Sequence, residues 1–270
     1  MTPADRLHDE LLDLAVKLAA TAGELLVSGR PADLRVADTK SSATDVVTEM
    51  DRASERLIVD SILAARPGDG VLGEEGSDRA GTSGVRWVID PIDGTVNYLY
   101  GIPLWSVSIG VEVDGVMEVG VVEMAALQQT FTAVRGRGAT MHRAGVTRGL
   151  RVNDPVSLDR ALVGTGFGYT VERRTTQAAV VAELLPRVRD IRRGGACSVD
   201  LCWVASGLQD AYYESGAQPW DLAAGGLIAA EAGALVTGLA GAQAGEAMAL
   251  AAGPALHREL DRTLQQLTSR

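Results

Sequence analysis

The sequence predicts a mixed α and β fold whose two halves are organised differently. Three observations support this prediction: a helical apolar stripe at 4–28, a series of short apolar runs from 70 to 134, and alternating helical and strand-like segments after about residue 150. A chain of 270 residues can hold one large domain or two lobes. We expect an N-terminal α+β half at 1–150 and a C-terminal α/β half at 151–270, which together form one compact unit.

In the first half, two helices precede the strands. The first is predicted at 4–28 and the second at about 48–65, ahead of the helix-ending pair Pro67-Gly68. The stripe of the first helix consists of Leu7, Leu11, Leu14 and Leu18. Strands are then predicted at 70–73, 86–89, 104–113, 116–124 and 130–134. Asp114-Gly115 lies between two of these runs and indicates a hairpin.

In the second half, helices and strands are expected to alternate. Helices are predicted at about 172–186, 198–206 and 220–232, and from Pro254 onward. Strands are predicted at 189–193, 210–214, 234–237 and 247–252.

The composition is that of an ordinary soluble globular protein, with 46% hydrophobic and 22% charged residues. A net charge of −10 argues against binding to a nucleic-acid backbone, which requires clustered Lys and Arg. An acidic protein that binds an anionic substrate needs a local positive charge, and a bound metal ion supplies one. We therefore expect no nucleic-acid partner.

Targeting signals are not evident in the sequence. The N-terminus is acidic and amphipathic and does not resemble a signal peptide, and no apolar run approaches the ~20 residues needed to cross a bilayer. Cys197 and Cys202 are five residues apart in a segment predicted to be helical, so a disulfide between them is not expected. These features favour a cytoplasmic protein without a membrane partner.

Two aspartates lie at the end of a strand that the sequence predicts to be buried. Asp90 and Asp93 follow the run Arg-Trp-Val-Ile in the segment DPIDGT. The alternative reading is an ordinary turn, because Asp-Pro and Asp-Gly are common loop dipeptides. Buried acids are costly unless they are paired or hold a cation, and Mg²⁺ prefers one or two carboxylates together with substrate phosphate. Gly94 would allow a phosphate to approach the backbone, and Thr95 offers an N–H and a hydroxyl. We therefore favour a metal and phosphate site.

Four further acidic residues are ambiguous when each is considered alone. Glu74 and Glu75 end another short apolar run, although most such pairs are solvated. Asp221 opens an Ala-rich helix and could equally be an N-cap or a metal ligand. Asp51 lies three residues after Thr48, where a capping box is slightly favoured. Lys40 can be read as a lone solvated lysine.

Other candidate motifs are weak. The stretch 164–168, GTGFG, lacks the last glycine of a dinucleotide-binding loop, and no helix is evident directly after it. His8, His142 and His257 are scattered, which argues against a zinc hydrolase. The chain has no G-x-S-x-G and no P-loop.

Taken together, these motifs resemble the inositol monophosphatase family of Mg²⁺-dependent, lithium-sensitive sugar and polyol phosphatases. The matching segments are Lys40 to Asp51, Gly73-Glu-Glu, Asp90-Pro-Ile-Asp-Gly-Thr and Trp220-Asp, and the resemblance covers nearly the whole chain. It implies a layered αβαβα sandwich and a homodimer. It also implies two to three Mg²⁺ ions in each active site.

The resemblance assigns roles to individual residues. Glu74, Asp90 and the carbonyl of Ile92 would bind the first metal ion, and Asp90, Asp93 and Asp221 the second. Glu74 with waters would bind a weaker third. Thr95, with Asp51 behind it, would orient and deprotonate a metal-activated water, and Glu75 would support them. The residues implied to contact substrate are Ile92, Asp93, Gly94, Thr95, Arg192, Gly195, Ala196, Cys197, Glu214 and Asp221.

One departure from the family concerns the substrate. Where relatives commonly carry Gly-Ser/Thr-Ala-Ala, this chain reads Gly195-Ala-Cys-Ser, which removes a hydroxyl at Ala196 from the substrate rim. The leading interpretation is hydrolysis of inositol 1-phosphate. The alternatives are histidinol phosphate, fructose 1,6-bisphosphate or a 3′-phosphonucleotide as substrate, and a regulatory or scaffold protein that retains the fold.

Overall fold

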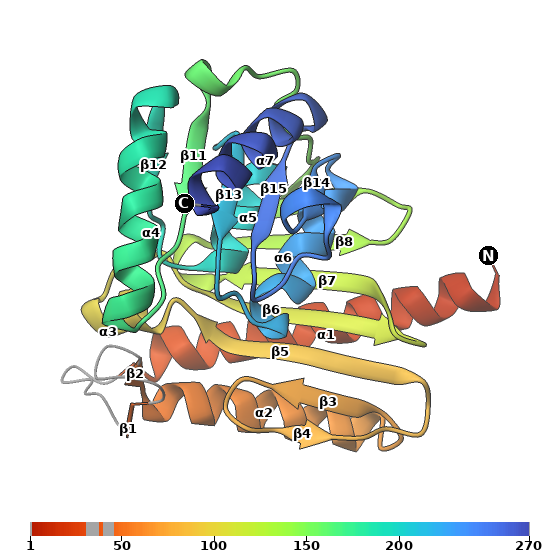
Figure 1. The fold of residues 1–270 in the computed structure, drawn as a ribbon. Coiled ribbons are helices and arrows are strands. Elements are labelled where there is room, and N and C mark those ends of the chain that lie inside the picture. Colours follow the sequence, from red (N-terminus) through yellow and green to blue (C-terminus); the bar gives the residue numbers. More distant parts are fainter. Residues whose placement is uncertain (1, 31–37, 40–45, 270) are drawn as a thin grey trace.

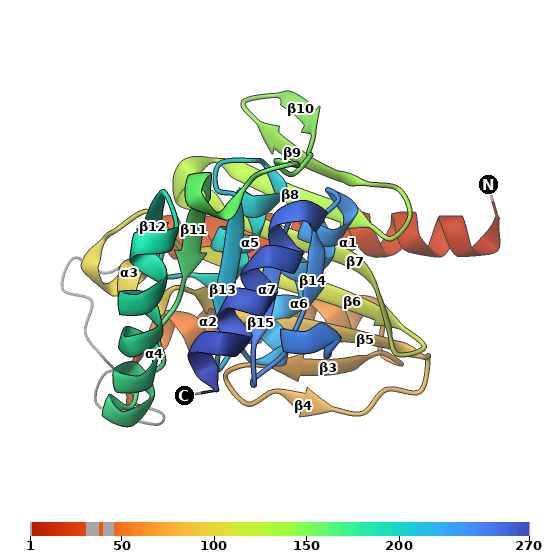
Figure 2. The ribbon, with the colours of Figure 1, turned by 45° about the horizontal axis from the view of Figure 1, so that its top comes forward.

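Helices and sheets alternate in layers through the computed structural model, which describes residues 2–30, 38–39 and 46–269 (Figure 1). Two helices cover the outer face of an eight-stranded sheet, two more lie between this sheet and a five-stranded sheet, and another two cover the far side (Figure 2). In this order the helices are α1 (Pro3–Ser28) and α2 (Glu49–Ala65), α5 (Cys197–Ala205) and α6 (Pro219–Glu231), and α4 (Val171–Leu184) and α7 (Pro254–Thr268). The predicted αβαβα sandwich is confirmed.

The eight-stranded sheet is built entirely from residues 70–149. Its order is β10-β9-β8-β7-β6-β5-β3-β4, and neighbours are antiparallel except for the parallel pair β3 and β5. The predicted hairpin at Asp114-Gly115 joins β6 to β7, and both residues have the positive φ that this turn requires. The strands are β3 (Gly70–Gly73), β4 (Asp78–Arg79), β5 (Val85–Asp93), β6 (Ser106–Val113), β7 (Val116–Met124), β8 (Gln129–Val134), β9 (Ala139–Arg143) and β10 (Val146–Gly149).

The five-stranded sheet belongs to the second half of the chain. Its order is β12-β11-β13-β15-β14, and β11 is parallel to both β12 and β13. The carboxyl ends of these three strands therefore lie at one edge of the sheet, as the ends of parallel strands do. The strands are β11 (Leu162–Thr165), β12 (Asp190–Arg192), β13 (Ala211–Glu214), β14 (Leu235–Thr237) and β15 (Ala249–Ala252).

Two glycines allow α6 to lie directly against the first sheet. A Cβ on Gly110 of β6 would lie 2.6 Å from the Cβ of Ala223, and one on Gly120 of β7 would lie 2.8 Å from the carbonyl oxygen of Ala224. Small residues on both surfaces therefore fix the distance between helix and sheet. This contact sets the position of Asp221, which lies in the first turn of α6.

Several short elements were not predicted. They are α3 (Thr95–Tyr100), β1 (Asp38–Thr39), β2 (Val46–Val47), β4, β9, β10 and β11, with single 3₁₀ turns at η1 (Ala125–Leu127), η2 (Leu158–Arg160), η3 (Leu185–Arg187) and η4 (Leu239–Gly241). Each predicted helix and strand is present, with ends shifted by a few residues. Lys40 lies outside the described residues. The two sheets use separate stretches of sequence, and the division into halves at residue 150 stays a prediction.

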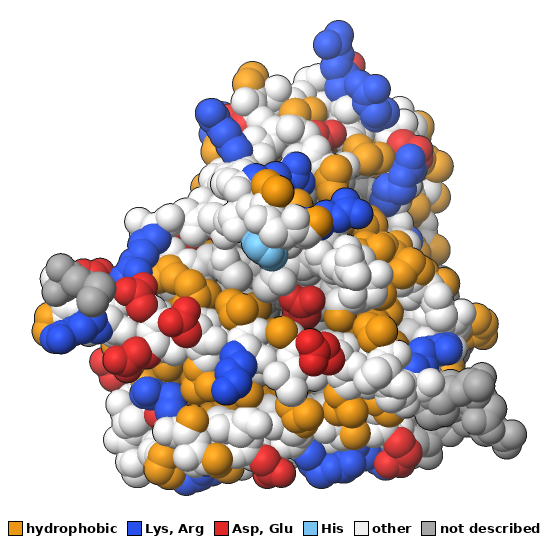
Figure 3. All heavy atoms as spheres, turned by 180° about the vertical axis from the view of Figure 1, so that it is seen from behind, with side chains coloured by type: hydrophobic (Ala, Val, Ile, Leu, Met, Phe, Trp, Pro, Cys, Tyr) orange, Lys and Arg blue, Asp and Glu red, His pale blue; other side chains and the backbone are white. Residues whose placement is uncertain are grey.

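The outer surface shows no large area of one chemical type on the side opposite to that of Figure 1. Acidic, basic and hydrophobic side chains are interspersed over this face, with Arg and Lys side chains gathered toward its upper end (Figure 3). In the part of the chain that the structure describes, no helix combines the length and the apolar character needed to span a bilayer.

Candidate functional site

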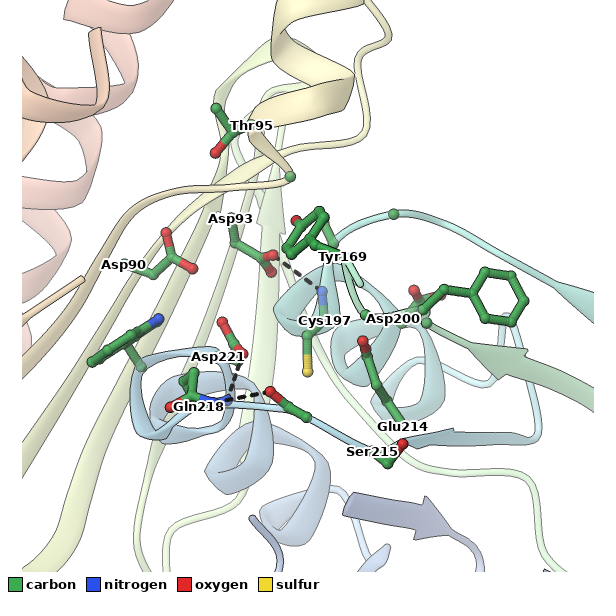
Figure 4. A pocket seen from close by; sticks show the side chains of 18 of the residues that line it. Asp90, Asp93, Thr95, Tyr169, Cys197, Asp200, Glu214, Ser215, Gln218 and Asp221 are labelled. Atoms are coloured by element: carbon green, nitrogen blue, oxygen red, sulfur yellow. Dashed lines mark hydrogen bonds between the residues drawn. The ribbon is translucent and has the colours of Figure 1, made fainter. Parts of the chain in front are cut away.

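A cavity of about 570 Å³ opens where the two sheets and the central helices meet. It is lined by residues from both halves of the chain, including the ends of β5, β11 and β13 and the first turns of α5 and α6 (Figure 4). The predicted site residues that line it are Glu74, Asp90, Ile92, Asp93, Gly94, Thr95, Gly195, Ala196, Cys197, Glu214 and Asp221. Asp51, Glu75 and Arg192 are absent from this lining.

Strand β5 delivers two buried acids to the cavity. Asp90 is 2% exposed and Asp93 is 7% exposed. The pairing of β5 with β6 shifts register between these two residues, so that Pro91 and Ile92 form an irregularity in the ladder. The backbone N–H of Ile92 donates to Asp90 Oδ1 at 3.0 Å, which turns this carboxylate back along the chain.

Four of the acids that line the cavity, Glu74, Asp90, Asp93 and Asp221, are the predicted metal ligands, and their charges oppose one another. Burial, followed by the charges of Glu74, Asp93 and Asp221, raises the pKa of Asp90 well above its ordinary value. Burial, followed by the charges of Asp93 and Glu74, does the same to the pKa of Asp221. Figure 4 shows Asp90, Asp93 and Asp221 around a single space. Such a group cannot be fully ionised at neutral pH unless a cation compensates it.

The donor set fits a hard divalent cation. Carboxylate and carbonyl oxygens are the ligands that Mg²⁺ prefers, and the described part of the chain brings no histidine to this cavity. Within the same described ranges, no three acidic, histidine or cysteine side chains already converge on one point. The acids line a common space, and their oxygens accept hydrogen bonds from neighbouring backbone N–H groups.

Thr95 and Asp51 form a hydrogen-bonded pair beside the acids. The hydroxyl Oγ1 of Thr95 lies 3.0 Å from Asp51 Oδ1 and 3.1 Å from the carbonyl oxygen of Ile92. The other oxygen of Asp51, Oδ2, accepts the N–H of Thr48 at 2.8 Å and its hydroxyl at 2.5 Å. The capping box read from the sequence is therefore present at the start of α2, and Asp51 also reaches Thr95.

Burial is the main reason that the pKa of Asp51 is raised, and the charge of Glu75 adds to it. Hydrogen bonds from Thr48 and Thr95 act in the opposite direction and favour the ionised form. Glu75 therefore lies close enough to influence this pair electrostatically without lining the cavity.

The turn that carries Glu74 and Glu75 is fixed from beneath by α2. Glu55 is 3% exposed, and its carboxylate accepts the N–H of Glu75 at 2.7 Å and that of Ser77 at 3.0 Å. Ser54 donates to the carbonyl oxygen of Pro91 at 3.1 Å. One helix thus anchors both acidic segments of the site.

Gly94 begins α3 and has a φ of 93°, which a residue with a side chain rarely adopts. A Cβ there would lie 3.0 Å from the carbonyl oxygen of Leu104 and 3.1 Å from the Cβ of Ala196. Two neighbouring segments therefore exclude a side chain at this point of the cavity wall.

The turn 194–197 joins the first half of the site to the second. Asp93 Oδ1 accepts the N–H of Cys197 at 3.2 Å, and Oδ2 accepts the N–H of Ser198 at 2.6 Å. The N-cap residue of α5, Ala196, makes no side-chain cap hydrogen bond, so a carboxylate from another strand caps this helix. Asn97 strengthens the junction, because its amide donates to the carbonyl oxygen of Gly194 at 2.9 Å.

Glu214 lies across the cavity from the aspartates of β5 (Figure 4). It forms a short hydrogen bond with the hydroxyl of Tyr212, two residues earlier on the same face of β13. Burial raises the pKa of Glu214, and the charge of Arg193 lowers it in part. A Cβ on Gly166 would lie 2.0 Å from this carboxylate, so the loop after β11 leaves it room only because residue 166 is a glycine.

Asp221 is not the N-cap of α6. Gln218 occupies the N-cap position, and Asp221 at N3 accepts its backbone N–H at 2.6 Å in a capping box. The helix begins at Pro219, before the predicted start, because proline is favoured in the first turn. The capping function and the position in the cavity are thus compatible.

The structure directs Arg192 away from the cavity. Its guanidinium bonds the carboxylate of Asp190 at 2.5 Å and is largely exposed. Arg193, the residue directly after β12, lines the cavity instead. Burial raises the pKa values of Asp93 and Glu214, and the charge of Arg193 offsets part of this rise.

Several residues of the site were not predicted. Ser198 and Asn97 do not line the cavity but support its wall, and they have no distinctive sequence pattern because both act through contacts made across about a hundred residues. Phe167 and Tyr169 lie in the glycine-rich stretch that was weighed as a dinucleotide loop, and they line the cavity together with Arg173. The glycines of this stretch signalled a binding segment, although not its partner.

Comparisons with known proteins place this arrangement in context. The sequence pattern of the Inositol monophosphatase family matches residues 7–269. The inositol-1-monophosphatase of Mycobacterium bovis is 44% identical, and the match covers 98% of this chain and 97% of that protein. The solved structure of Mycobacterium tuberculosis SuhB has a TM-score of 0.82 at 44% identity, covering 96% of this chain and 97% of that one. A Pseudomonas aeruginosa protein named Nus factor SuhB is 39% identical over 86% of both chains.

Proposed function

Because the chain belongs to the inositol monophosphatase family, we propose that it is a Mg²⁺-dependent phosphomonoesterase that hydrolyses inositol 1-phosphate to inositol and phosphate. The observation that carries this proposal is the cavity where four acids from both halves of the chain lie beside the Thr95–Asp51 pair. The departure at Ala196 concerns the rim of this cavity and leaves all four acids in place.

Glu74, Asp90 and the carbonyl of Ile92 would hold one Mg²⁺, and Asp90, Asp93 and Asp221 would hold a second. Glu74 would contribute to a third. Bound Mg²⁺ neutralises the charge of the phosphate and activates water for in-line displacement. The mutual repulsion that raises the pKa values of Asp90 and Asp221 supports this assignment, since a cation would relieve it.

Thr95 and Asp51 would move the proton of the attacking water. The water would donate to Thr95 Oγ1 while the hydroxyl proton of Thr95 passes to Asp51 Oδ1, which lies 3.0 Å away. Thr48 holds the other oxygen of Asp51, so the acceptor cannot rotate away. Oxygen from water then forms the new bond to phosphorus as the bond to the alcohol oxygen breaks. Glu75 would support the pair through its charge.

The phosphate would lie against Gly94 and the backbone N–H of Thr95, where no side chain intervenes. Glu214, the turn Gly195-Ala196-Cys197 and Arg193 would face the alcohol portion. A carboxylate held by Tyr212 suits recognition of a substrate hydroxyl, which favours a polyol. Histidinol phosphate, fructose 1,6-bisphosphate and a 3′-phosphonucleotide remain the alternative substrates.

A phosphate-release assay tests the proposal. The protein is incubated with inositol 1-phosphate, the three alternative substrates and an aryl phosphate, with Mg²⁺ or with excess chelator. We expect inositol 1-phosphate to have the highest kcat/KM, chelator to abolish turnover, and lithium to inhibit it. Turnover in excess chelator, or a phosphoenzyme trapped on Asp90 by rapid quenching, would refute the mechanism.

We also propose a homodimer. The family resemblance supports this proposal, and the exposed side chains of Tyr100 (77%) and Val171 (81%) are available to a partner surface. Sedimentation equilibrium would give twice the chain mass if this is correct, and the chain mass if it is wrong. A cytoplasmic location stays a prediction, supported by the free thiols of Cys197 and Cys202.

A regulatory role is the second candidate, and the relatives named Nus factor SuhB favour it. The absence of a nucleic-acid partner therefore stays a prediction. To test this prediction, the protein is titrated into labelled RNA and DNA at physiological salt. Binding that is lost at higher salt would be electrostatic binding to the nucleic acid.

A further inference from the structure

The sequence Gly195-Ala-Cys-Ser places a hydroxyl directly beneath a predicted metal ligand. Ser198 is fully buried, and its Oγ donates to Asp93 Oδ2 at 2.5 Å. The common family pattern has alanine at this position and a hydroxyl two residues earlier, at the position of Ala196. In this chain a hydroxyl is thus missing from the rim of the cavity and present behind Asp93.

A second buried serine lies behind this hydroxyl. Ser106 Oγ lies 2.7 Å from Ser198 Oγ, and Ser106 is also fully buried. An ionised carboxylate can only accept hydrogen bonds, so the proton of Ser198 points to Asp93 and Ser106 donates to Ser198. The three groups form a chain with one direction, from Ser106 through Ser198 to Asp93.

The two carboxylate oxygens of Asp93 accept different numbers of hydrogen bonds. Oδ2 accepts both the hydroxyl and the N–H of Ser198, whereas Oδ1 accepts only the N–H of Cys197, at 3.2 Å. Each carboxylate oxygen offers two lone pairs, so Oδ2 is fully used and Oδ1 retains one. The two N–H donors come from the backbone at the start of α5, and only the hydroxyl depends on a side chain.

We propose that Ser198 is a positioning residue that holds Asp93 so that Oδ1 alone is presented to the divalent cation. Ser106 donates to the Ser198 hydroxyl and makes no contact with Asp93 itself, and the Ser198 hydroxyl points to Asp93 without it because an ionised carboxylate can only accept. This inference rests on the proposed function, because it requires that Asp93 binds a metal ion. Hydrogen bonds that orient a metal ligand commonly change metal affinity by about ten- to a hundredfold.

Titration with Mn²⁺, followed by electron paramagnetic resonance and calorimetry, tests the proposal without relying on turnover. Ser198→Ala should bind Mn²⁺ roughly tenfold more weakly than the unaltered protein. Its kcat at saturating metal should recover most of the unaltered value, with KM for substrate unchanged. Ser106→Ala is the matched control, since it removes an equally buried hydroxyl that does not contact Asp93, and it should bind Mn²⁺ within about twofold of the unaltered protein.

In Ser198→Ala the buried hydroxyl of Ser106 loses its hydrogen-bond partner, and this could impair folding. The double variant Ser106→Ala/Ser198→Ala removes both hydroxyls, so its Mn²⁺ affinity can be measured even if Ser198→Ala folds poorly. It should show the same weakening as Ser198→Ala. Unchanged Mn²⁺ affinity in the double variant, or equal weakening in Ser106→Ala, would overturn the role of Ser198 while the proposed function stands. If the unaltered protein binds no Mn²⁺, the proposed function fails and this inference fails with it.

Discussion

The two carboxylate oxygens of Asp51 have different partners. Oδ2 completes the capping box of α2 with Thr48, and Oδ1 accepts the hydroxyl of Thr95. The cap fixes the side chain, so the oxygen that faces Thr95 needs no further support. A residue that the sequence indicated as a helix cap therefore also serves the predicted proton path.

Removing either member of this pair should lower turnover more than substrate binding. In Thr95→Ala and Asp51→Asn we expect kcat to fall by about 10²- to 10⁴-fold, the usual contribution of a positioned general base. KM should change little, because the lost interaction belongs to the transition state. Steady-state kinetics on inositol 1-phosphate measures both values. Thr95→Ser keeps the hydroxyl and is the control that should retain most of the activity.

Glu214 should discriminate between alcohols rather than assist the chemical step. If its carboxylate accepts a substrate hydroxyl, Glu214→Gln should lower kcat/KM for polyol phosphates by roughly ten- to a hundredfold, as expected for a hydrogen bond to a charged group. An aryl phosphate lacks this hydroxyl and should be affected little. Glu246→Gln makes the same change at the exposed rim of the cavity and provides the comparison. Equal losses on both substrates would show that Glu214 does not recognise the alcohol.

For individual residues, the sequence predicted which ones belong to the site better than it predicted where their side chains point. The family resemblance predicted which acids would share a cavity, whereas the apolar runs before Glu74 and Asp90 indicated only that these two segments end buried strands. It did not distinguish Arg192 from Arg193, since the choice depends on where β12 ends, and the strand stops at Arg192. It also did not assign Asp221 to the N3 position, because this depends on where α6 begins.

Helix α5 carries a buried carboxyl group that the proposed mechanism does not use. Asp200, in its first turn, is 1% exposed and lines the cavity, and burial raises its pKa to about 8. The amide of Gln209 donates to its Oδ1 at 3.2 Å. Because the pKa is higher in the folded protein, the contribution of Asp200 to stability is complete below the unfolded value of 3.8 and is lost as the pH rises through about 8.

The variant Asp200→Asn tests this assignment, since it preserves shape and cannot ionise. Relative to the unaltered protein, its free energy of unfolding should increase progressively from pH 5 to pH 9. Urea unfolding at several pH values, in chelator, measures the difference. Asp210→Asn is a suitable comparison, because it makes the same change at a carboxylate that does not line the cavity. A difference that does not vary with pH would mean that Asp200 remains ionised in the folded protein.

The elements that the sequence missed share a physical cause. Strand β11 spans only Leu162–Thr165 and contains a glycine, so it lacks the β-branched run that marks a central strand. It is a strand because β12 and β13 pair with it on both sides. Helix α3 is six residues long and follows Gly94, too short for any helical periodicity to be visible.

In the whole molecule, the acids of the cavity come from the eight-stranded sheet on one side and from α6 on the other. A cation bound among them would therefore connect both halves of the chain. The raised pKa values of Asp90 and Asp221 imply that, without a cation, these residues contribute most to stability at low pH and that this contribution is lost as the pH rises through their folded values.

Binding of Mg²⁺ should therefore raise the melting temperature more at pH 8 than at pH 5. A ligand at about a hundred times its Kd contributes about 2.7 kcal/mol, which corresponds to roughly 5–10 °C for a chain of this size. Differential scanning calorimetry with Mg²⁺ or with chelator measures the shift. Asp90→Asn should lose most of it, since this residue is predicted to contact two ions. An equal shift in that variant would contradict the ligand assignment.

The layered architecture followed from the family resemblance rather than from periodicity. Apolar patterns predicted a mixed fold and most of its elements, since each helix stripe and strand run had to be buried. They could not predict that α5 and α6 lie between two sheets, because both helices are apolar on nearly every side and show no preferred face. The small residues Gly110 and Gly120 permit the close contact between α6 and the sheet. Their role can be recognised only when this packing is known.

The anchoring of the turn 74–77 on Glu55 has a consequence for how the site fluctuates. The amides of Glu75 and Ser77 both donate to one buried carboxylate on α2, so neither can exchange its hydrogen with solvent unless that contact opens. Deuterium labelling should therefore find these two amides protected to a degree more typical of a core helix than of a surface turn. In Glu55→Gln one acceptor oxygen is replaced by a donor, and labelling of the turn should become fast. If the amide hydrogens of this turn exchange as slowly as those of the helix beneath it, the turn rarely opens. Each turnover would then begin from a single arrangement of the active site.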